Sequence, residues 1–290
     1  MLVRVLAVGD VVSEPGLRHL EKHLRSLQKC EGISFTVVNG ENAASVGLTP
    51  EQAWRIYDAG ADVVTLGNHT FGKMQIADFL DDTPWLLRPA NFTGRAPGRG
   101  CGVYDLGGVR IRVMNLIGRC DLSWGADNPF TTADRLLAAE QAELTVVDFH
   151  AQATSEKLAM GYYLDGRVSA LWGTHTHVPT ADCQVLDRGL GFVTDLGMTG
   201  PAHSVLGIRP EFLSITGGGN VECEIYGAMP TGMESTVKVR IGEYLLTGVV
   251  FGSTLFTIGS KHLLDITGSS VMLFDRSSGR RITSGTLKLL

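Results

Sequence analysis

The chain has 290 residues, of which 44% are hydrophobic and 19% are charged, and its formal net charge at pH 7 is −5. This composition is ordinary for a globular protein, and the length suffices for one or two domains. The small negative charge gives no reason to expect stable binding to nucleic acid. No apolar run approaches the roughly 20 residues that a membrane-spanning helix needs, so we expect no membrane partner.

The chain begins with an apolar run over residues 1–10 that resembles a secretory signal. It lacks a basic start and a small-residue cleavage site, so a first sheet strand is the better interpretation. The five cysteines are odd in number and include no C-x-x-C pair, which argues against a disulfide framework and against a thiolate zinc site. We therefore expect free thiols in a reducing cytoplasm.

Strand-like and helix-like segments alternate from residue 1 to about residue 215. Helical spacing of leucines and local start signals predict five helices: 16–29, 49–60, 73–80, 132–142 and 155–164. The second helix has the clearest start, because Thr49 can cap it, Pro50 takes the first helical position and Gln52 follows the cap by three residues. The alternation indicates a layered α/β domain.

From about residue 218 the texture changes. A glycine-rich stretch at 217–220 is typical of a hinge and predicts a catalytic domain, 1–217, and an accessory domain, 218–290. Closely spaced strands without helices follow, which is typical of a small all-β sandwich or barrel. The predicted strands are 221–226, 235–241, 244–251, 263–266, 270–274 and 286–289.

Five predicted strands stop at clusters of polar, metal-binding side chains. These clusters are Asp10, 39–42, 67–69, 148–150 and 173–177. Ligands of open α/β sheets bind at the carboxyl ends of the strands. The five clusters together therefore predict one convergent site of carboxylate, amide and imidazole groups.

The clusters supply seven candidate metal ligands: Asp10, Glu41, Asn42, Asn68, His150, His175 and His177. Oxygen and imidazole donors without thiolate suit Mn, Fe or Zn. Seven donors are too many for one tetrahedral zinc ion and fit two ions that share a bridging carboxylate. On an extended segment, His175 and His177 would point to the same face. Each histidine or asparagine, considered alone, could instead be an ordinary core, surface or turn residue without a role in metal binding.

The ordered motifs resemble the calcineurin-like metallophosphoesterase superfamily. They are Gly9-Asp10, Gly40-Glu41-Asn42, Gly67-Asn68-His69, His150 and Gly173-Thr174-His175-Thr176-His177. With the strings 88–91, 153–157 and 165–170, they are similar to its YmdB-like branch over residues 2 to about 213, and the tail beyond 218 departs from that branch. Val12 stands where the superfamily usually has histidine, and Glu41 where it has aspartate, as in this branch. Gln152 replaces a glutamate that is common there.

The resemblance implies a layered β-sandwich flanked by helices, followed by a small all-β domain. It also implies two divalent or trivalent ions, iron first with Mn or Zn as alternatives. One ion would be held by Asp10, Glu41, Asn42 and His177, and the other by Glu41, Asn68, His150 and His175. His69 would be the catalytic residue, acting as an acid or stabilising the oxyanion.

The implied reaction is hydrolysis of a phosphodiester, with 2′,3′-cyclic nucleotides first, by attack of a metal-bound hydroxide. Arg88, Asn91 and Arg119 are candidate substrate contacts, with a structural role as the alternative for each. A homo-oligomer is also implied. The alternatives left open are a phosphomonoesterase or 5′-nucleotidase of the same superfamily, and a metal-dependent regulator or scaffold. The tail is weakly similar to the small TOBE-type barrels appended to transport ATPases.

Overall fold

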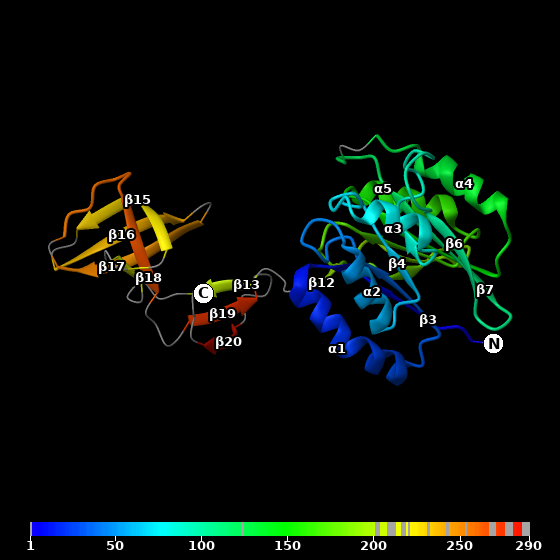
Figure 1. The fold of residues 1–290 in the computed structure, drawn as a ribbon, viewed down its shortest axis with the longest axis horizontal. Coiled ribbons are helices and arrows are strands. Elements are labelled where there is room, and N and C mark those ends of the chain that lie inside the picture. Colours follow the sequence, from blue (N-terminus) through cyan, green and yellow to red (C-terminus); the bar gives the residue numbers. More distant parts are fainter. Residues whose placement is uncertain are drawn as a thin grey trace. The chain divides into compact units, whose positions relative to one another are not determined.

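The computed structural model forms two compact units, 1–201 and 202–290 (Figure 1). The domain boundary expected from the sequence lies later in the chain, near residue 218. The structure describes these residues: 2–122, 125–200, 204–207, 213–215, 219, 221–230, 233–241, 244–252, 254–266, 271–275 and 281–285. None of the helices within these ranges is long and apolar enough to cross a bilayer. The hinge expected at 217–220, except for Gly219, and the strand expected at 286–289 lie outside the described residues.

The first sheet of unit 1 is parallel, with the strand order β1-β3-β4-β5. Its strands are β1 (Val5–Val8), β3 (Phe35–Asn39), β4 (Val63–Thr65) and β5 (Leu86–Leu87). Three helices belong to this half: α1 (Ser13–Glu31), α2 (Pro50–Ala59) and α3 (Ile76–Asp82). Their apolar faces bury Leu17, Ile56 and Leu80 in one core with Val38 and Val64 of the sheet.

The second sheet has the strand order β10-β11-β9-β8-β7-β6. Its strands are β6 (Cys101–Asp105), β7 (Arg110–Ile117), β8 (Leu144–His150), β9 (Ala170–Thr174), β10 (Gln184–Val185) and β11 (Gly191–Val193). The four inner strands are parallel, and both edge strands are antiparallel to their neighbours. Helices α4 (Pro129–Ala139) and α5 (Thr154–Leu164) contribute Ala133 and Met160 to the core with Phe149. Strands β6 and β7 were not anticipated from the sequence.

The two sheets pack face to face. Phe35, Val37 and Val63 of the first sheet share a core with Val113 and Trp172 of the second. Helices therefore cover the two outer faces, and the layered α/β sandwich expected from the sequence is confirmed (Figure 1). A small parallel pair, β2 (Asp10–Val11) with β12 (Met198–Thr199), lies after the end of β1.

The helix boundaries follow local chemistry. Helix α2 has the complete capping box between Thr49 and Gln52, as the sequence predicts. Helix α4 begins at Pro129, three residues before the predicted start, because Asn128 caps it and proline fits the first turn. Helix α3 begins at Ile76, three residues later than predicted, since the backbone before it is in turns.

Unit 2 is all-β within the residues described. The strand order β14-β18-β15-β16-β17 makes an antiparallel sheet, and β13-β19-β20 makes a second one. The strands are β13 (Ser204–Gly207), β14 (Leu213–Ile215), β15 (Val221–Pro230), β16 (Glu234–Ile241), β17 (Tyr244–Phe251), β18 (Lys261–Ile266), β19 (Val271–Asp275) and β20 (Arg281–Gly285). The outer strands β14 and β17 also contact one another, so the five-stranded sheet curls toward closure.

Candidate metal centre

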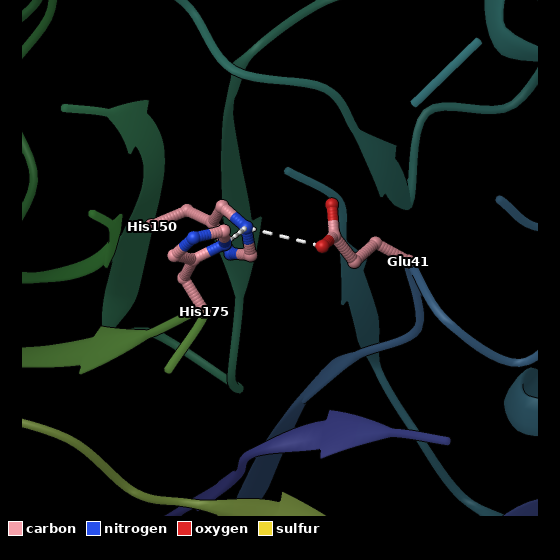
Figure 2. Close-up of side chains that lie close together, drawn as sticks. All are labelled: Glu41, His150 and His175. Carbon is pink, nitrogen blue, oxygen red and sulfur yellow. Dashed lines mark hydrogen bonds and ion pairs between the residues drawn. The ribbon is translucent and has the colours of Figure 1, made fainter. Parts of the chain in front are cut away.

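Three candidate ligands from different strand ends meet in the interior of unit 1. Their ligand atoms, on Glu41, His150 and His175, all lie within 4.8 Å of one another (Figure 2). His150 Nε2 is 3.1 Å from Glu41 Oε1 and 3.1 Å from His175 Nδ1. Glu41 follows β3 of the first sheet, whereas His150 ends β8 and His175 follows β9 of the second. The cluster therefore closes across the gap between the sheets.

Asn68 completes this group. Its Oδ1 lies 2.9 Å from His150 Nε2. The preceding residue must be glycine, because a Cβ on Gly67 would lie 2.3 Å from both Glu41 Oε2 and His150 Nε2. The loop after β4 can approach the cluster this closely only without a side chain.

A second group, of Asp10, Asn42 and His177, adjoins the first. Asn42 Nδ2 is 3.2 Å from Glu41 Oε1 and 3.1 Å from His177 Nε2. His177 Nε2 is 3.7 Å from Asp10 Oδ1, and the backbone N–H of His175 donates to Asp10 Oδ2 at 3.1 Å. All seven predicted ligands are thus brought together, with the Glu41 carboxylate between the two groups.

The convergence of the two histidines does not come from an extended strand. Strand β9 ends at Thr174, and the backbone of His175 and His177 is left-handed, with φ of 98° and 63°. Such conformations cost about 1–3 kcal/mol each in a residue other than glycine and persist only where the surroundings enforce them. The two imidazoles are therefore positioned by a turn, which contacts with the surrounding residues must stabilise.

The electrostatics of the cluster suit a cation. Asp10 is fully buried and its Oδ1 accepts no hydrogen bond within the described part of the protein. Burial opposes the charge of Asp10, but the contact with His177 and the nearby imidazoles outweigh it and hold its pKa below the usual value. Burial, together with the charge of His150, lowers the pKa of His175 to about 4, so that this imidazole is neutral at pH 7.

His150 differs from its neighbour. Burial opposes its charge, but Glu41 and Asp10 outweigh burial and raise its pKa to about 9. Without a metal, a proton thus balances part of the buried negative charge. An orphaned carboxylate oxygen, a neutral imidazole and a bridging carboxylate are donors that fit the expected ions.

The catalytic candidate His69 lies beside this cluster. Its backbone N–H donates to Glu41 Oε2 at 3.1 Å, and its side chain is half-buried. The loop that follows β7 carries Arg119, an exposed residue. The Glu156 carboxylate holds this loop by accepting the backbone N–H groups of Arg119 and Cys120.

Two candidate substrate contacts, Arg88 and Asn91, make structural hydrogen bonds. Arg88 is buried, and its guanidinium donates to the carbonyls of Pro89, Ala96 and Pro97. Asn91 is fully buried and bonds both backbone groups of Ile117 and the carbonyl of Asp127. These contacts with the loop backbone favour the structural role that the sequence left open for each residue.

The buried polar residues behind the histidines were missed from the sequence. Asp148 is fully buried and accepts hydrogen bonds from Thr65, Thr174 and Asn39. Its position two residues before His150 on one strand, hence on the same face, is a signal that could have revealed it.

A buried ion pair supports the histidine turn. Lys157 Nζ lies 2.6 Å from Asp195 Oδ2, and both side chains are 1% exposed. The same oxygen accepts the Thr176 hydroxyl at 2.8 Å, and Asp195 Oδ1 accepts the Gly197 N–H at 2.8 Å. Thr176 stands between the two left-handed histidines, so the pair holds their turn in place.

Comparisons with known proteins identify the family. A family model described as YmdB-like protein matches residues 6–251. The chain belongs to the YmdB-like family. It is 46% identical over 251 residues to a protein of Bacillus subtilis (strain 168) named 2′,3′-cyclic-nucleotide 2′-phosphodiesterase, covering 86% of this chain and 90% of that protein. The family match reaches residue 251, which corrects the expectation that the resemblance ends near residue 213.

Solved structures agree with this assignment. A hypothetical protein from Thermus thermophilus is 32% identical, with a TM-score of 0.66 over 87% of this chain and 100% of that one. A phosphatase from Mycoplasma pneumoniae is 24% identical, with a TM-score of 0.64 over 99% and 93%, and shows the shared fold. The chain is therefore a metallophosphoesterase-fold hydrolase of the phosphodiesterase and phosphatase class.

The close approach at Gly67 generates a first prediction. Gly67→Ala should displace Glu41 or His150 and weaken metal binding by about tenfold or more, which calorimetric titration would measure. Gly94→Ala is the matched control, because nothing lies within 4 Å of the Cβ that it would add. Unchanged metal affinity in Gly67→Ala would contradict the cluster geometry.

The buried ion pair generates a second prediction. Lys157→Met leaves Asp195 buried and charged without its partner, and should lower the free energy of unfolding by about 3–5 kcal/mol in chemical denaturation. Adding Asp195→Asn removes the orphaned charge and should recover part of this loss. Arg18→Met, which breaks an exposed pair with Glu14, should cost at most about 1 kcal/mol. Equal losses of unfolding free energy in Lys157→Met and Arg18→Met would refute a stabilising role for the buried Lys157–Asp195 pair.

Proposed function

We propose that the chain hydrolyses phosphodiesters, 2′,3′-cyclic nucleotides first, at a two-metal site held by the seven clustered residues. The observation that carries this proposal is the meeting of two buried residues, Glu41 and His150, with half-buried His175 at the carboxyl ends of strands from both sheets. The substrate class is supported by the name of the Bacillus subtilis relative at 46% identity.

The proposed ligand sets follow the two groups of side chains. Asp10, Asn42 and His177 would hold one ion, while Asn68, His150 and His175 would hold the other. Glu41 would bridge them, which is supported by the contacts of its Oε1 with Asn42 on one side and His150 on the other. When bound, two such ions would supply Lewis acidity to the phosphoryl oxygens and make a water molecule more acidic.

The remaining steps belong to the chain itself. His69 is placed by its own backbone N–H on Glu41, and its side chain is half-buried. We assign it the role of a hydrogen-bond donor to the phosphoryl group and of the acid that protonates the leaving alkoxide. We also propose Arg119 as a contact for the substrate phosphate, because it is exposed and follows β7, whose last residue, Ile117, pairs with His150.

Iron is the metal that we propose first. Mn and Zn are alternatives, because oxygen and imidazole donors bind all three metals. We also propose a cytoplasmic homo-oligomer. All five cysteines are free, which supports a reducing compartment. Elemental analysis of the purified protein would identify the metal, and light scattering would give the number of subunits.

The substrate proposal is tested by assays of metal-loaded protein on 2′,3′-cyclic AMP, 3′,5′-cyclic AMP and a nucleoside 5′-monophosphate. The first should be hydrolysed fastest. Glu41→Gln should reduce turnover to background, because the amide cannot supply the bridging charge. Preference for the monophosphate would favour a phosphomonoesterase, and full activity of Glu41→Gln would remove the bridging role.

The role of His69 is tested by His69→Ala. This change should leave the metal content at the wild-type level and lower kcat by roughly a hundredfold or more. His19→Ala, an exposed histidine on α1, serves as the control and should have full activity. Loss of metal from His69→Ala would instead make His69 a ligand.

A further inference from the structure

A closed polar network lies directly behind His150, on the Nδ1 side of its ring. Thr174 Oγ1 is 3.0 Å from His150 Nδ1 and 2.7 Å from Asp148 Oδ1. The other oxygen of Asp148 accepts from the Thr65 hydroxyl, and from Asn39 Nδ2 at 3.2 Å. All five side chains are at most 1% exposed. The hydrogen-bond directions within such a network are restricted by the few donors and acceptors present.

The backbone sets the first direction. The N–H of Glu41 can only donate, and it lies 3.2 Å from Asn39 Oδ1, so this oxygen is the acceptor. The Asn39 amide nitrogen therefore faces Asp148 and donates to it. Thr65 donates to the same oxygen. A carboxylate that receives donors on both oxygens acts as an acceptor throughout.

The second direction follows at Thr174. Its single hydroxyl hydrogen is directed to Asp148 Oδ1 at 2.7 Å, which leaves only lone pairs for its other neighbours. His150 Nδ1, at 3.0 Å, must then donate its hydrogen to Thr174. The other acceptor near Nδ1 is Asp10 Oδ1, which at 4.0 Å is beyond hydrogen-bond distance.

The consequence appears at the opposite ring nitrogen. His150 Nε2 faces Glu41 Oε1, Asn68 Oδ1 and His175 Nδ1, at 3.1, 2.9 and 3.1 Å. A neutral imidazole that keeps its hydrogen on Nδ1 presents the Nε2 lone pair to this cluster. Which nitrogen of a ligating histidine can bind a metal is set by the hydrogen bond of the other nitrogen.

We propose that Thr174 and Asp148 are positioning residues that fix the Nδ1–H tautomer of His150 and aim its Nε2 lone pair at the metal. This inference rests on the proposed metal site. Thr174 ends β9, and the turn that carries His175 and His177 begins directly after it. The residue that contacts His150 Nδ1 is therefore also the residue from which this turn starts. Thr65 and Asn39 belong to the first sheet, and both donate to Asp148 Oδ2, the oxygen that does not bind Thr174.

Two threonines on one carboxylate provide a matched test. Thr174→Val and Thr65→Val each remove one hydroxyl from Asp148, but only Thr174 also contacts His150. Titration of the metal-free protein with Mn²⁺ should show binding about 10–100-fold weaker in Thr174→Val. Thr65→Val should keep its Mn²⁺ affinity within about threefold of wild type, and Thr174→Ser, which restores the hydroxyl, should recover it.

A direct readout needs no variant. In Zn²⁺-loaded protein with ¹⁵N-labelled histidine, two-bond proton–nitrogen spectra should show the hydrogen of His150 on Nδ1. A hydrogen on Nε2, or Mn²⁺ affinity unchanged in Thr174→Val, would overturn the inference while leaving the proposed function in place. Equal weakening in both valine variants would reduce the network to a merely structural role and would also overturn it. Wild-type protein that binds neither iron nor Mn²⁺ nor Zn²⁺ would remove the proposed function and this inference together.

Discussion

The contact between Glu41 and His150 Nε2, 3.1 Å long, is the interaction on which the site depends. It joins two sheets that also meet through an apolar core, which includes Val37, Val113 and Trp172, and through the hydrogen bonds of Asp148. Burying a carboxylate and an imidazole there would be unfavourable without compensation. Other site residues, among them Asn68 and His175, compensate at His150 Nε2. Thr174, which is bonded to Asp148, compensates at His150 Nδ1.

Part of the support of the site comes from a helix that carries no candidate ligand. Helix α5 contributes Lys157, which reaches Asp195 and through it Thr176. The same helix contributes Glu156, which holds the backbone of the loop after β7. Strained histidines and an open loop are thereby tied to one well-packed helix. The α/β sandwich thus brings the candidate ligands together and also fixes the backbone of the segments that carry them or lie beside them.

The sequence predicts much of this arrangement because strand ends carry short-range signals. The apolar runs before Glu41, Asn68 and His150 place these residues at strand ends, and Thr49 with Gln52 marks a helix start. The facing of the two sheets depends on contacts between residues far apart in sequence, which no local pattern contains. For the same reason the roles of Asp148 and Asp195 were missed, and the sequence left open whether Arg88 and Asn91 contact the substrate or the loop backbone.

His175 and His177 illustrate a correct expectation with an incorrect reason. Their spacing predicts a shared direction only on an extended segment. The structure brings them together through left-handed backbone instead, with φ of 98° and 63°. Local spacing indicated the pair, whereas the conformation that places it is imposed by Asp195, 19 residues beyond Thr176 and reached through the fold.

We propose that the seven clustered side chains hold two metal ions on either side of the Glu41 carboxylate. Anomalous diffraction from crystals of the active protein, with data collected on both sides of the absorption edge of its metal, would locate these ions. Two peaks per chain are expected, one beside Asp10 and His177 and the other beside His150 and His175. Active protein whose crystals show no peak at Glu41, or metal only elsewhere in the chain, would rule this arrangement out.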